Sequence, residues 1–505
     1  MSTDRRPIDE LISEHNSVID PAATRIGILL AGGHGKRIRS ETSKMLHEIW
    51  GRPSALRVAD AVRRGLDSQS QIVVAGIKGP DVIRSTGPRD GRVFAYQENP
   101  ALGLPAGTGD AVRIALDAFA DTGKNRDIYI FPGDMGLLSS TVVDHFRRIF
   151  EASEADMMLL TGLYSGPVDG NYYGRILRVP ETDASGKPSG DDKDRVIEIR
   201  QHRDILDLAP DQTYKVEFNG RTYVFDRQFL LETREIDTLV FAFRETHLRE
   251  HIHQLQTDNA QGELQLTDLV HRYNQNGLVV RATVAEREED ILAFNVKSVW
   301  RQMEAIARRS AYEQLKDTIT IVDEEDFFIA DEVVEQIIEL DKEHGPLDIV
   351  IGQGVQIGPS VKLNRRVQIG DRSRLTGNIV LGVDVHIGVG VELSTYPNQT
   401  LELGDAVQIL SRNILKGNLR IGSGSRIESG VIMTGSDDYP LRVGERVTVK
   451  GTSYLYGCLV DDDLDIEHSV IKCKHVGAVR NHDGMVQPVR YILPTPEGLD
   501  SVSDL

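Results

Sequence analysis

The sequence predicts two successive folds: an α/β domain with a mixed, mostly parallel sheet, followed by a parallel β-helix. Two observations support this. Strand-like and helix-like segments alternate over residues 25–165, and a repeat of six residues begins after residue 348. A chain of 505 residues is long enough to form two or three domains, each with its own core.

The α/β prediction depends on the order of apolar segments. Strand-like runs occupy 25–30, 71–77, 127–131 and 156–163, and runs with helical periodicity occupy 53–66, 108–119 and 139–150. Residues 180–195 are polar, with proline and glycine, and predict a loop or insertion. Helical patterns return in 244–275 and 296–316, and the acidic stretch 323–345 is expected to be a connector.

The repeat region starts with IVIGQG, VQIGPS, VKLNRR and VQIGDR and continues with LRIGSG, SRIESG and VIMTGS. An aliphatic residue often opens each hexad, a second follows two positions later, and glycine often comes next. Short strands with a period of six are typical of a parallel β-helix in which about three hexads form one coil. A β-sandwich is the alternative, but it does not explain the fixed spacing.

Composition excludes several classes of protein. The formal net charge of −19 disfavours bulk binding to nucleic acid or to anionic lipid, although a local basic pocket can still bind phosphate. No apolar stretch is long enough to span a bilayer, and residues 1–24 lack the apolar core of a signal peptide. Cys458 and Cys473 are the only cysteines, which excludes a disulfide framework and favours the cytoplasm.

The first candidate site is the sequence LAGGHGKR at residues 30–37, directly after the first strand. A glycine-rich turn lets backbone N–H groups approach phosphate oxygens. Arg37 can hold a phosphate with two hydrogen bonds, and Lys44 can neutralise a second charge. The turn matches neither the Walker A nor the GxGxxG pattern, so an ordinary tight turn is the alternative.

Two further candidates follow. GTGDA at residues 107–111 lies ten residues after Gln97, at an expected helix start with Thr108 as its N-cap; a plain helix start is the alternative. Pro132-Gly133-Asp134 follows the strand DIYIF, where a carboxylate is well placed to bind Mg²⁺ on substrate phosphates; a solvated turn aspartate is the alternative. No nucleophile motif such as GxSxG is present.

These motifs, in this order, resemble those of the sugar-1-phosphate nucleotidyltransferases. The similarity is greatest to the uridylyltransferase half of the bifunctional N-acetylglucosamine-1-phosphate uridylyltransferases. The family's LAAGxGTRMxSxxPKxL corresponds to LAGGHGKRIRSETSKML, its GDxPL to GDMGL, and its YGRI to YGRI at residues 173–176. Its NAQGEYYLTD corresponds to NAQGELQLTD at 259–268, its GVN to Phe294-Asn295 and, loosely, its EINTG to Glu217–Gly220. The resemblance covers about residues 25–305.

The resemblance implies a Rossmann-like nucleotidyltransferase domain followed by a left-handed parallel β-helix. It implies Mg²⁺-dependent transfer of a nucleotidyl group from UTP to a sugar-1-phosphate, with GlcNAc-1-phosphate favoured, to give a UDP-sugar and pyrophosphate. Arg37 and Lys44 would be the catalytic residues, and Asp134 and Asn295 would bind the metal. The nucleotide would be held by Leu30, Ala31, Gly32, Gly33, Gln97, Gly107 and Thr108, and the sugar by Gly174, Gln201 and Asn219.

The sequence departs from the family in three places. Ser43 replaces the proline before the motif lysine, Gln201 replaces the sugar-binding glutamate, and the asparagine segment lacks its Thr-Gly. The acetyltransferase motifs HLSYLGD and NYDG are absent from the β-helix, which is therefore expected to be an oligomerisation or regulatory module, with a homotrimer favoured. Residual acetyltransferase activity and a catalytically silent regulatory subunit are the alternatives.

The expected domain limits follow from these patterns. They are a leader at 1–24, the nucleotidyltransferase domain at 25–305, a helical linker at 306–347, the β-helix at 348–475 and a tail at 476–505.

Overall fold

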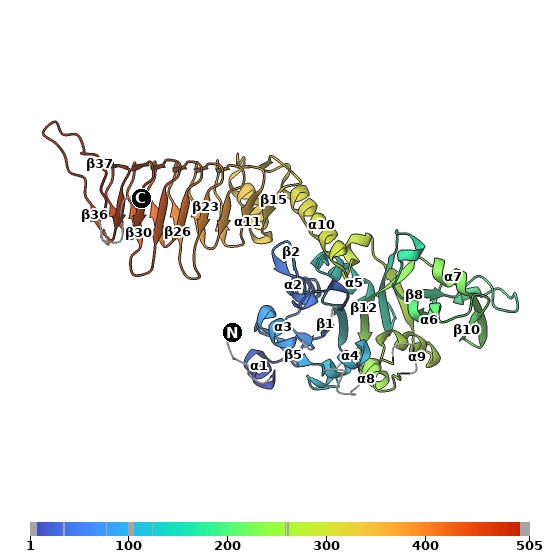
Figure 1. Ribbon diagram of the computed structural model, residues 1–505. Helices are drawn as coiled ribbons and strands as arrows, with labels where there is room; N and C mark the ends of the chain where they lie inside the picture. Colours follow the sequence, from blue (N-terminus) through green and yellow to red (C-terminus); the bar gives the residue numbers. More distant parts are fainter. Residues whose placement is uncertain are drawn as a thin grey trace, which may run out of the picture. The chain divides into compact units, whose positions relative to one another are not determined.

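The computed structural model divides the chain into two compact units, Met1–Glu304 and Ala305–Leu505, drawn in Figure 1. It describes residues 8–33, 36–76, 78–98, 106–123, 125–257, 259 and 262–494.

The first unit is built on a nine-stranded sheet with the order β13-β7-β12-β6-β1-β4-β5, from which β8 and β9 branch at β12. β1, β4, β5 and β6 are parallel, and β12 runs antiparallel between β6 and β7. The predicted mixed, mostly parallel sheet is therefore confirmed. Its strands are β1 (Arg25–Ala31), β4 (Gln71–Ala75), β5 (Arg92–Tyr96), β6 (Asp127–Pro132), β7 (Met157–Leu163), β8 (Arg175–Arg178), β9 (Val196–Arg200), β12 (Glu235–Arg244) and β13 (Val280–Val284).

Helices cover both faces of this sheet because its central strands are apolar on both sides. One face is covered by α1 (Ile8–His15), α2 (Ser54–Leu66), α3 (Gly79–Thr86) and α5 (Ser140–Glu151). The other face is covered by α4 (Thr108–Asp117), α8 (Glu245–Ile252) and α9 (Leu269–Gln275). The unit also holds η1 (Lys36–Ile38), η2 (Lys44–Leu46), a small ladder of β2 (Glu48–Ile49) with β3 (Arg52–Pro53), and η4 (Val168–Gly170), η6 (Leu266–Asp268) and η7 (Glu288–Ile291).

The predicted leader is partly built into this unit. Leu11 of α1 is buried in the core on the α2 side, and the side chain of Asn16 accepts a hydrogen bond from the Phe94 backbone N–H at 2.6 Å. Ile19 is buried in the opposite core. Residues 8–24 therefore belong to the α/β fold. Their contacts are made with distant parts of the chain, such as β5, and the local sequence does not reveal such contacts.

A smaller lobe extends beyond β8 and β9 with a core of its own. It contains η5 (Gly190–Asp192), α6 (His202–Leu206), the hairpin of β10 (Thr213–Phe218) with β11 (Arg221–Asp226), and α7 (Arg227–Glu232). Residues 180–195 form mostly turns and bends, as their composition predicts.

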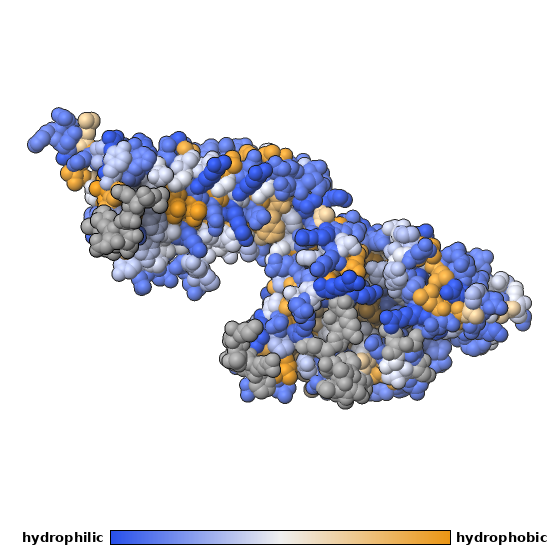
Figure 2. All heavy atoms as spheres, in the orientation of Figure 1, coloured by the Kyte–Doolittle hydropathy of each residue, from blue (hydrophilic) through white to orange (hydrophobic). Residues whose placement is uncertain are grey.

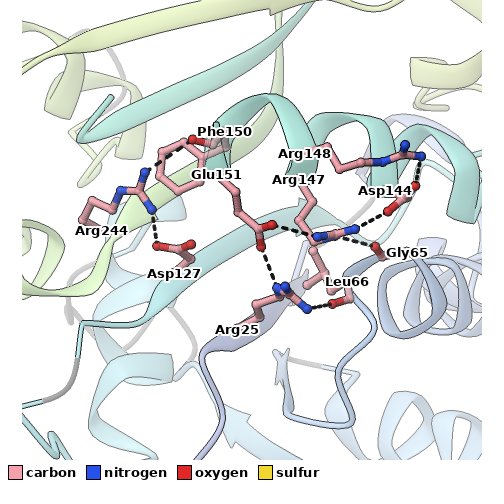
Figure 3. A network of polar contacts seen from close by, with 10 residues as sticks. All are labelled: Arg25, Gly65, Leu66, Asp127, Asp144, Arg147, Arg148, Phe150, Glu151 and Arg244. Carbon is pink, nitrogen blue, oxygen red and sulfur yellow. Dashed lines mark hydrogen bonds and ion pairs between the residues drawn. The ribbon is translucent and has the colours of Figure 1, made fainter. Parts of the chain in front are cut away.

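An ion-pair network ties together the amino-terminal edge of the parallel strands (Figure 3). Arg25, at the start of β1, donates to Glu151 at 2.6 Å, and Arg244, at the end of the antiparallel β12, pairs with Asp127 at 2.7 Å. Arg147 links Glu151 to a further aspartate on α5. This network lies at the sheet edge opposite the carboxyl ends of β1, β4 and β6. We therefore interpret it as stabilising the fold.

The second unit is a three-sided coil, seen as the stacked strands of Figure 1. Three parallel sheets of nine, eight and seven strands run along it, and each coil contributes about one strand to each sheet. This is the β-helix that the hexads predict. The first sheet contains β14 (Thr320–Ile321), β16 (Val350–Ile351), β19 (Gln368–Ile369), β22 (His386–Ile387), β25 (Gln408–Ile409), β28 (Arg426–Ile427), β31 (Thr448–Lys450), β34 (Asp465–Glu467) and β37 (Val489–Arg490).

The other two sheets repeat the same pattern. The second contains β15 (Phe327–Ile329), β17 (Val355–Ile357), β20 (Arg374–Thr376), β23 (Glu392–Ser394), β26 (Ile414–Gly417), β29 (Ile432–Gly435), β32 (Tyr454–Tyr456) and β35 (Val470–Lys472). The third contains β18 (Val361–Lys362), β21 (Ile379–Leu381), β24 (Leu401–Leu403), β27 (Leu419–Ile421), β30 (Leu441–Val443), β33 (Leu459–Val460) and β36 (His475–Val476).

Glycine recurs after many of these strands because successive coils approach closely there. A Cβ added to Gly370 would lie 2.8 Å from the carbonyl carbon of Gly388 in the next coil. Most aliphatic side chains of these strands point inward, as Ile369 and Ile387 do, and stack from coil to coil.

The β-helix is longer than its hexads indicate. β14 and β15 lie inside the predicted linker yet pair in parallel with β16 and β17, so the first coil precedes residue 348. Between them and the next coil, α11 (Asp331–His344) buries Val333, Val334 and Ile337. α10 (Lys297–Leu315) leads into this unit. At the other end, β37 of the predicted tail pairs with β34.

The outer surface is mostly hydrophilic on the face shown in Figure 2, with small apolar patches. In the described part of the chain, no helix is both long and apolar enough to cross a membrane.

Candidate functional site

A cavity of about 330 Å³ opens at the carboxyl ends of the parallel strands, where ligands bind in open α/β sheets. Of the predicted nucleotide-binding residues, all but Ala31 line it, and Lys44 and Asp134 line it as well. Ala31 is buried as the last residue of β1. His34 and Gly35 of the predicted turn, residues 99–105 between Gln97 and the GTGDA segment, and Ala260 and Gln261 lie outside the described residues.

The floor of the cavity is backbone brought unusually close together. A Cβ on Gly76, after β4, would lie 2.4 Å from the carbonyl oxygen of Gly32, after β1. A Cβ on Gly32 would lie 3.2 Å from the side-chain oxygen of Gln97. Gly76 therefore requires glycine, whereas a side chain at Gly32 would press against Gln97.

Gln97 is fixed at one wall. Its backbone N–H donates to Ala75, which continues the ladder beyond β5, and its side-chain amide donates to the carbonyl of Gly107 at 3.0 Å and to Asp110 at 2.9 Å. Asp110 is buried and also pairs with Arg113. The predicted association of Gln97 with the GTGDA segment is therefore a set of hydrogen bonds.

The GTGDA segment is itself held by contacts with residues 264–266. Gly107 has φ +106°, and a Cβ there would lie 2.4 Å from the carbonyl oxygen of Leu264. The backbone N–H of Gly109 donates to that oxygen at 2.8 Å, and the hydroxyl of Thr108 accepts from the N–H of Leu266 at 3.0 Å. Gly107, and not Thr108, is the N-cap of α4, because the threonine hydroxyl is used in this long-range contact.

Lys44, Asp134 and Asn295 meet at the mouth of the cavity. The Lys44 ammonium donates to Asp134 Oδ2 and, at 2.7 Å, to Asn295 Oδ1. Lys44 and Asp134 are 7% and 9% exposed, so this is a charged pair largely withdrawn from water. The three residues come from η2, from the turn after β6 and from the loop before α10, and the pattern of motifs grouped them correctly.

This cluster fits a divalent cation that also binds substrate phosphates. Its carboxylate and amide oxygens are hard ligands suited to Mg²⁺, and they already surround a positive charge, the Lys44 ammonium. Among the described residues, no group of three or more His, Cys, Asp or Glu side chains could hold a metal by itself. Mg²⁺ typically uses one or two protein ligands and takes the rest from phosphates and water.

Arg37 lies on η1 with an exposed side chain and does not line the cavity. Its charge nevertheless acts on Tyr173: burial and the nearby charge of Asp134 raise the pKa of that phenol, and Arg37 opposes the rise. Arg37 therefore lies near enough to Tyr173 for its charge to be felt there.

Gly174 and Gln201, which the resemblance assigns to the sugar, lie close to each other and to Asp237. A Cβ on Gly174 would lie 3.1 Å from the Gln201 amide nitrogen and 3.4 Å from the Asp237 Cβ, and the Asp237 N–H donates to the Gly174 carbonyl at 2.9 Å. Gln201 also donates to Thr267 at 3.4 Å. Burial raises the pKa of Asp237 to about 6, against a hydrogen bond from the Leu239 N–H that lowers it.

The comparisons with known proteins agree with this geometry. Residues 27–203 match the MobA-like NTP transferase domain. The bifunctional protein GlmU of Carboxydothermus hydrogenoformans is 26% identical over 369 residues, which is 72% of each chain. The GlmU of Streptomyces griseus is 30% identical over 71% of this chain and 64% of its own length. These similarities support a GlmU-like sugar-1-phosphate nucleotidyltransferase.

The similarity spans only part of some relatives. The chain covers 62% of the GlmU of Fervidobacterium nodosum and 58% of that of Clostridium tetani. A solved nucleotidyl transferase from Methanothermobacter is 14% identical with a TM-score of 0.34, covering 57% of this chain and 99% of its own.

Asn219, which the resemblance assigns to the sugar, does not line the cavity. Asn219 lies in the turn between β10 and β11 and donates to Asp192 at 2.8 Å, away from the cavity. The sequence EIDTL at the start of β12 fits the family's EINTG better than EFNG does, because β12 lies in the central sheet and brings Asp237 beside Gly174. The motif EIDTL can be recognised in the sequence, yet Asp237 is not among the predicted site residues.

The backbone conformation of Leu239 independently supports the correspondence between EIDTL and EINTG. It occupies the glycine position of EINTG, it has φ +60°, and it lines the cavity. A leucine in the left-handed region costs about 1–2 kcal/mol, which the bulge between Asp237 and Val240 must offset. The backbone of this strand thus keeps the conformation that glycine favours.

Proposed function

We propose that this nucleotidyltransferase uses Mg²⁺ to transfer a uridylyl group from UTP to GlcNAc-1-phosphate, releasing pyrophosphate. The observation that carries the proposal is the cluster of Lys44, Asp134 and Asn295 beside a cavity floored by Gly32 and Gly33. That arrangement offers a cation, metal ligands and open backbone at one point, which is what transfer to or from a phosphate requires.

The chain's own residues supply positioning and charge. Arg37 and Lys44 would bind the phosphates of the nucleotide, and Asp134 and Asn295 would hold the metal, which neutralises charge on the α-phosphate. An oxygen of the sugar phosphate attacks that phosphorus, the bond to the β-phosphate oxygen breaks, and pyrophosphate leaves. No protein nucleophile is needed, in keeping with the absence of a nucleophile motif from the sequence.

The pyrimidine would lie against Gln97, Gly107 and Thr108. The Gln97 amide group and the Gly107 backbone border the cavity and are held by hydrogen bonds independent of any ligand. Because the Gln97 amide and the Gly107 backbone are already held in place, they can favour one planar base over another at little entropic cost.

The sugar would lie against Gly174, Gln201 and Asp237. The family's glutamate and asparagine are here a glutamine and an aspartate, so one acid and one amide are retained with their positions exchanged. A double-mutant cycle tests this idea with kcat/KM for the sugar phosphate. Gln201→Glu and Asp237→Asn should each lower it by about tenfold, and the double variant should recover most of the loss. Additive losses would contradict the exchange.

The β-helix would serve as an oligomerisation module, with a homotrimer favoured. Ile414 and Ile432 stand next to each other on the outer side of β26 and β29 and are 40% and 41% exposed, which supports contact between copies. Light scattering of the purified protein measures the mass directly, and the double variant I414E/I432E should then become monomeric.

Cys458 and Cys473 are both free, which supports a cytoplasmic location.

The alternative is a catalytically silent regulatory subunit of the same fold. One experiment separates the two: pyrophosphate release with Mg²⁺, crossing UTP, dTTP, GTP, ATP and CTP with GlcNAc-1-phosphate, GalNAc-1-phosphate, glucose-1-phosphate and mannose-1-phosphate. Release with UTP and GlcNAc-1-phosphate supports the proposal, and release with another pair replaces the substrates but keeps the reaction. Silence from folded protein that binds UTP favours the regulatory alternative.

A further inference from the structure

The Lys44 ammonium occupies the place of the cation that Asp134 and Asn295 would bind. It donates to one oxygen of each, Asp134 Oδ2 and Asn295 Oδ1. The ring of Phe294 lies 5.7 Å away and adds a face that favours positive charge. The two metal-ligand oxygens are thus already satisfied by the protein itself.

The burial of the cluster explains why a partner is required. The side chains of Lys44 and Asp134 are only 8% and 12% exposed, and an isolated carboxylate at that depth would be strongly destabilised. The lysine therefore stabilises the carboxylate as long as no other cation is present. A divalent ion bound to the same oxygens would lie within a few ångströms of the ammonium, and the two charges would repel each other.

A second position is available to the Lys44 ammonium. Lys44 borders the cavity, together with Gly32 and Gly33, where the phosphates of a nucleotide are proposed to bind. Its flexible stem can swing toward those phosphates while η2 stays in place, since the Ser43 carbonyl accepts from the His47 ring at 3.0 Å and both residues are buried.

We propose that Lys44 is a built-in counter-ion that blocks the metal ligands until a nucleotide arrives. The nucleotide's phosphates draw the ammonium away, the oxygens of Asp134 and Asn295 become free, and the divalent ion enters with the nucleotide. Free metal alone then binds weakly. This inference rests on the proposed nucleotide site but not on the identity of the base, the sugar or the turnover.

Mn²⁺ binding, followed by electron paramagnetic resonance of the free ion, tests the proposal without any turnover. Without nucleotide, Lys44→Met should bind one Mn²⁺ at least tenfold more tightly than the wild type. Adding UTP should raise the Mn²⁺ affinity of the wild type at least tenfold more than that of the variant. Lys342→Met, at an exposed lysine of α11, is the matched control and should behave like the wild type.

Three results would overturn the proposal. They are micromolar binding of Mn²⁺ by the wild type alone, equal or weaker binding by Lys44→Met, and an equal effect of UTP on both proteins. Lys44→Gln, which keeps a hydrogen-bond donor for Asp134, replaces the methionine variant if the latter does not fold, and the wild-type titration stands in either case. Tighter Mn²⁺ binding by the variant, together with silence in the pyrophosphate assay, would refute the proposed function and leave this inference standing.

Discussion

The two units reach order by different routes. In the β-helix, a buried aliphatic residue stacks on its equivalent one coil away, as Ile387, Ile409 and Ile427 do. In the α/β unit, the site joins Lys44 to residues 90 and 251 positions away, and each contact is made once. A repeat therefore distributes its stability over many equivalent contacts, whereas a site concentrates its function in a few unique ones.

The largest expected effect concerns one of those unique contacts. Asp134→Asn keeps the shape of the side chain but removes the charge that would bind the metal. Pyrophosphate release should fall by at least about 10²-fold, as for the loss of one preorganised electrostatic partner. Steady-state assays and thermal melting measure the two consequences, and the melting temperature should change little. Asp384→Asn, at an exposed aspartate of the β-helix, should leave the rate unchanged; equal rates for all three proteins would remove Asp134 from the site.

A substitution in the core of the β-helix should have the opposite effect, lowering stability while leaving the rate of pyrophosphate release unchanged. Ile409→Ala leaves a cavity between two coils and should lower the stability of the second unit by about 2–5 kcal/mol without affecting the rate. Trp50 and Trp300, the only tryptophans, both lie in the first unit, so their fluorescence reports that unit, while circular dichroism reports both. Urea unfolding should shift by circular dichroism only. Val389→Ala, at an exposed position, is the control; a matching shift in fluorescence would mean that the units unfold together.

The buried carboxyl of Asp237 predicts a pH effect of intermediate size. Its pKa is about 6 in the folded protein and near 3.8 when unfolded, so the folded state binds more protons between these values. The free energy of unfolding should therefore fall as the pH rises from about 4 to about 6 and stay level above that, a loss on the order of 3 kcal/mol.

Asp237→Asn should abolish this dependence. Relative to the wild type, the variant should gain more stability at pH 7.5 than at pH 4, measured by urea unfolding at both values. A constant difference between the two proteins across this range would show that Asp237 titrates normally.

The smallest effect concerns Ser43, which replaces the family's proline. Its backbone has φ −55° and ψ 138°, a conformation that proline favours. Ser43→Pro should therefore be neutral or stabilising by about 0.4–1 kcal/mol, through a more restricted unfolded chain. Ser139→Pro provides the contrast in the same thermal melts: φ there is −97° and its hydroxyl caps α5, so that variant should be destabilised.

Much of the fold was determined by the sequence itself. The central α/β elements and most hexads can be recognised within a few residues, because hydrophobic periodicity and turn residues are local properties. Asp134 could be placed at the carboxyl end of a strand from the local pattern, whereas Asn295 was assigned to the same metal site only by the resemblance to the nucleotidyltransferases.

Only the tertiary structure decided the rest. EFNG and EIDT both read as the end or start of a strand, and only the pairing of β12 between β6 and β7 puts Asp237, and not Asn219, beside Gly174. Likewise, residues 320–329 become the first coil because β16 and β17 offer them an edge to pair with. Strand pairing depends on partners distant in the chain, and local pattern carries no record of them.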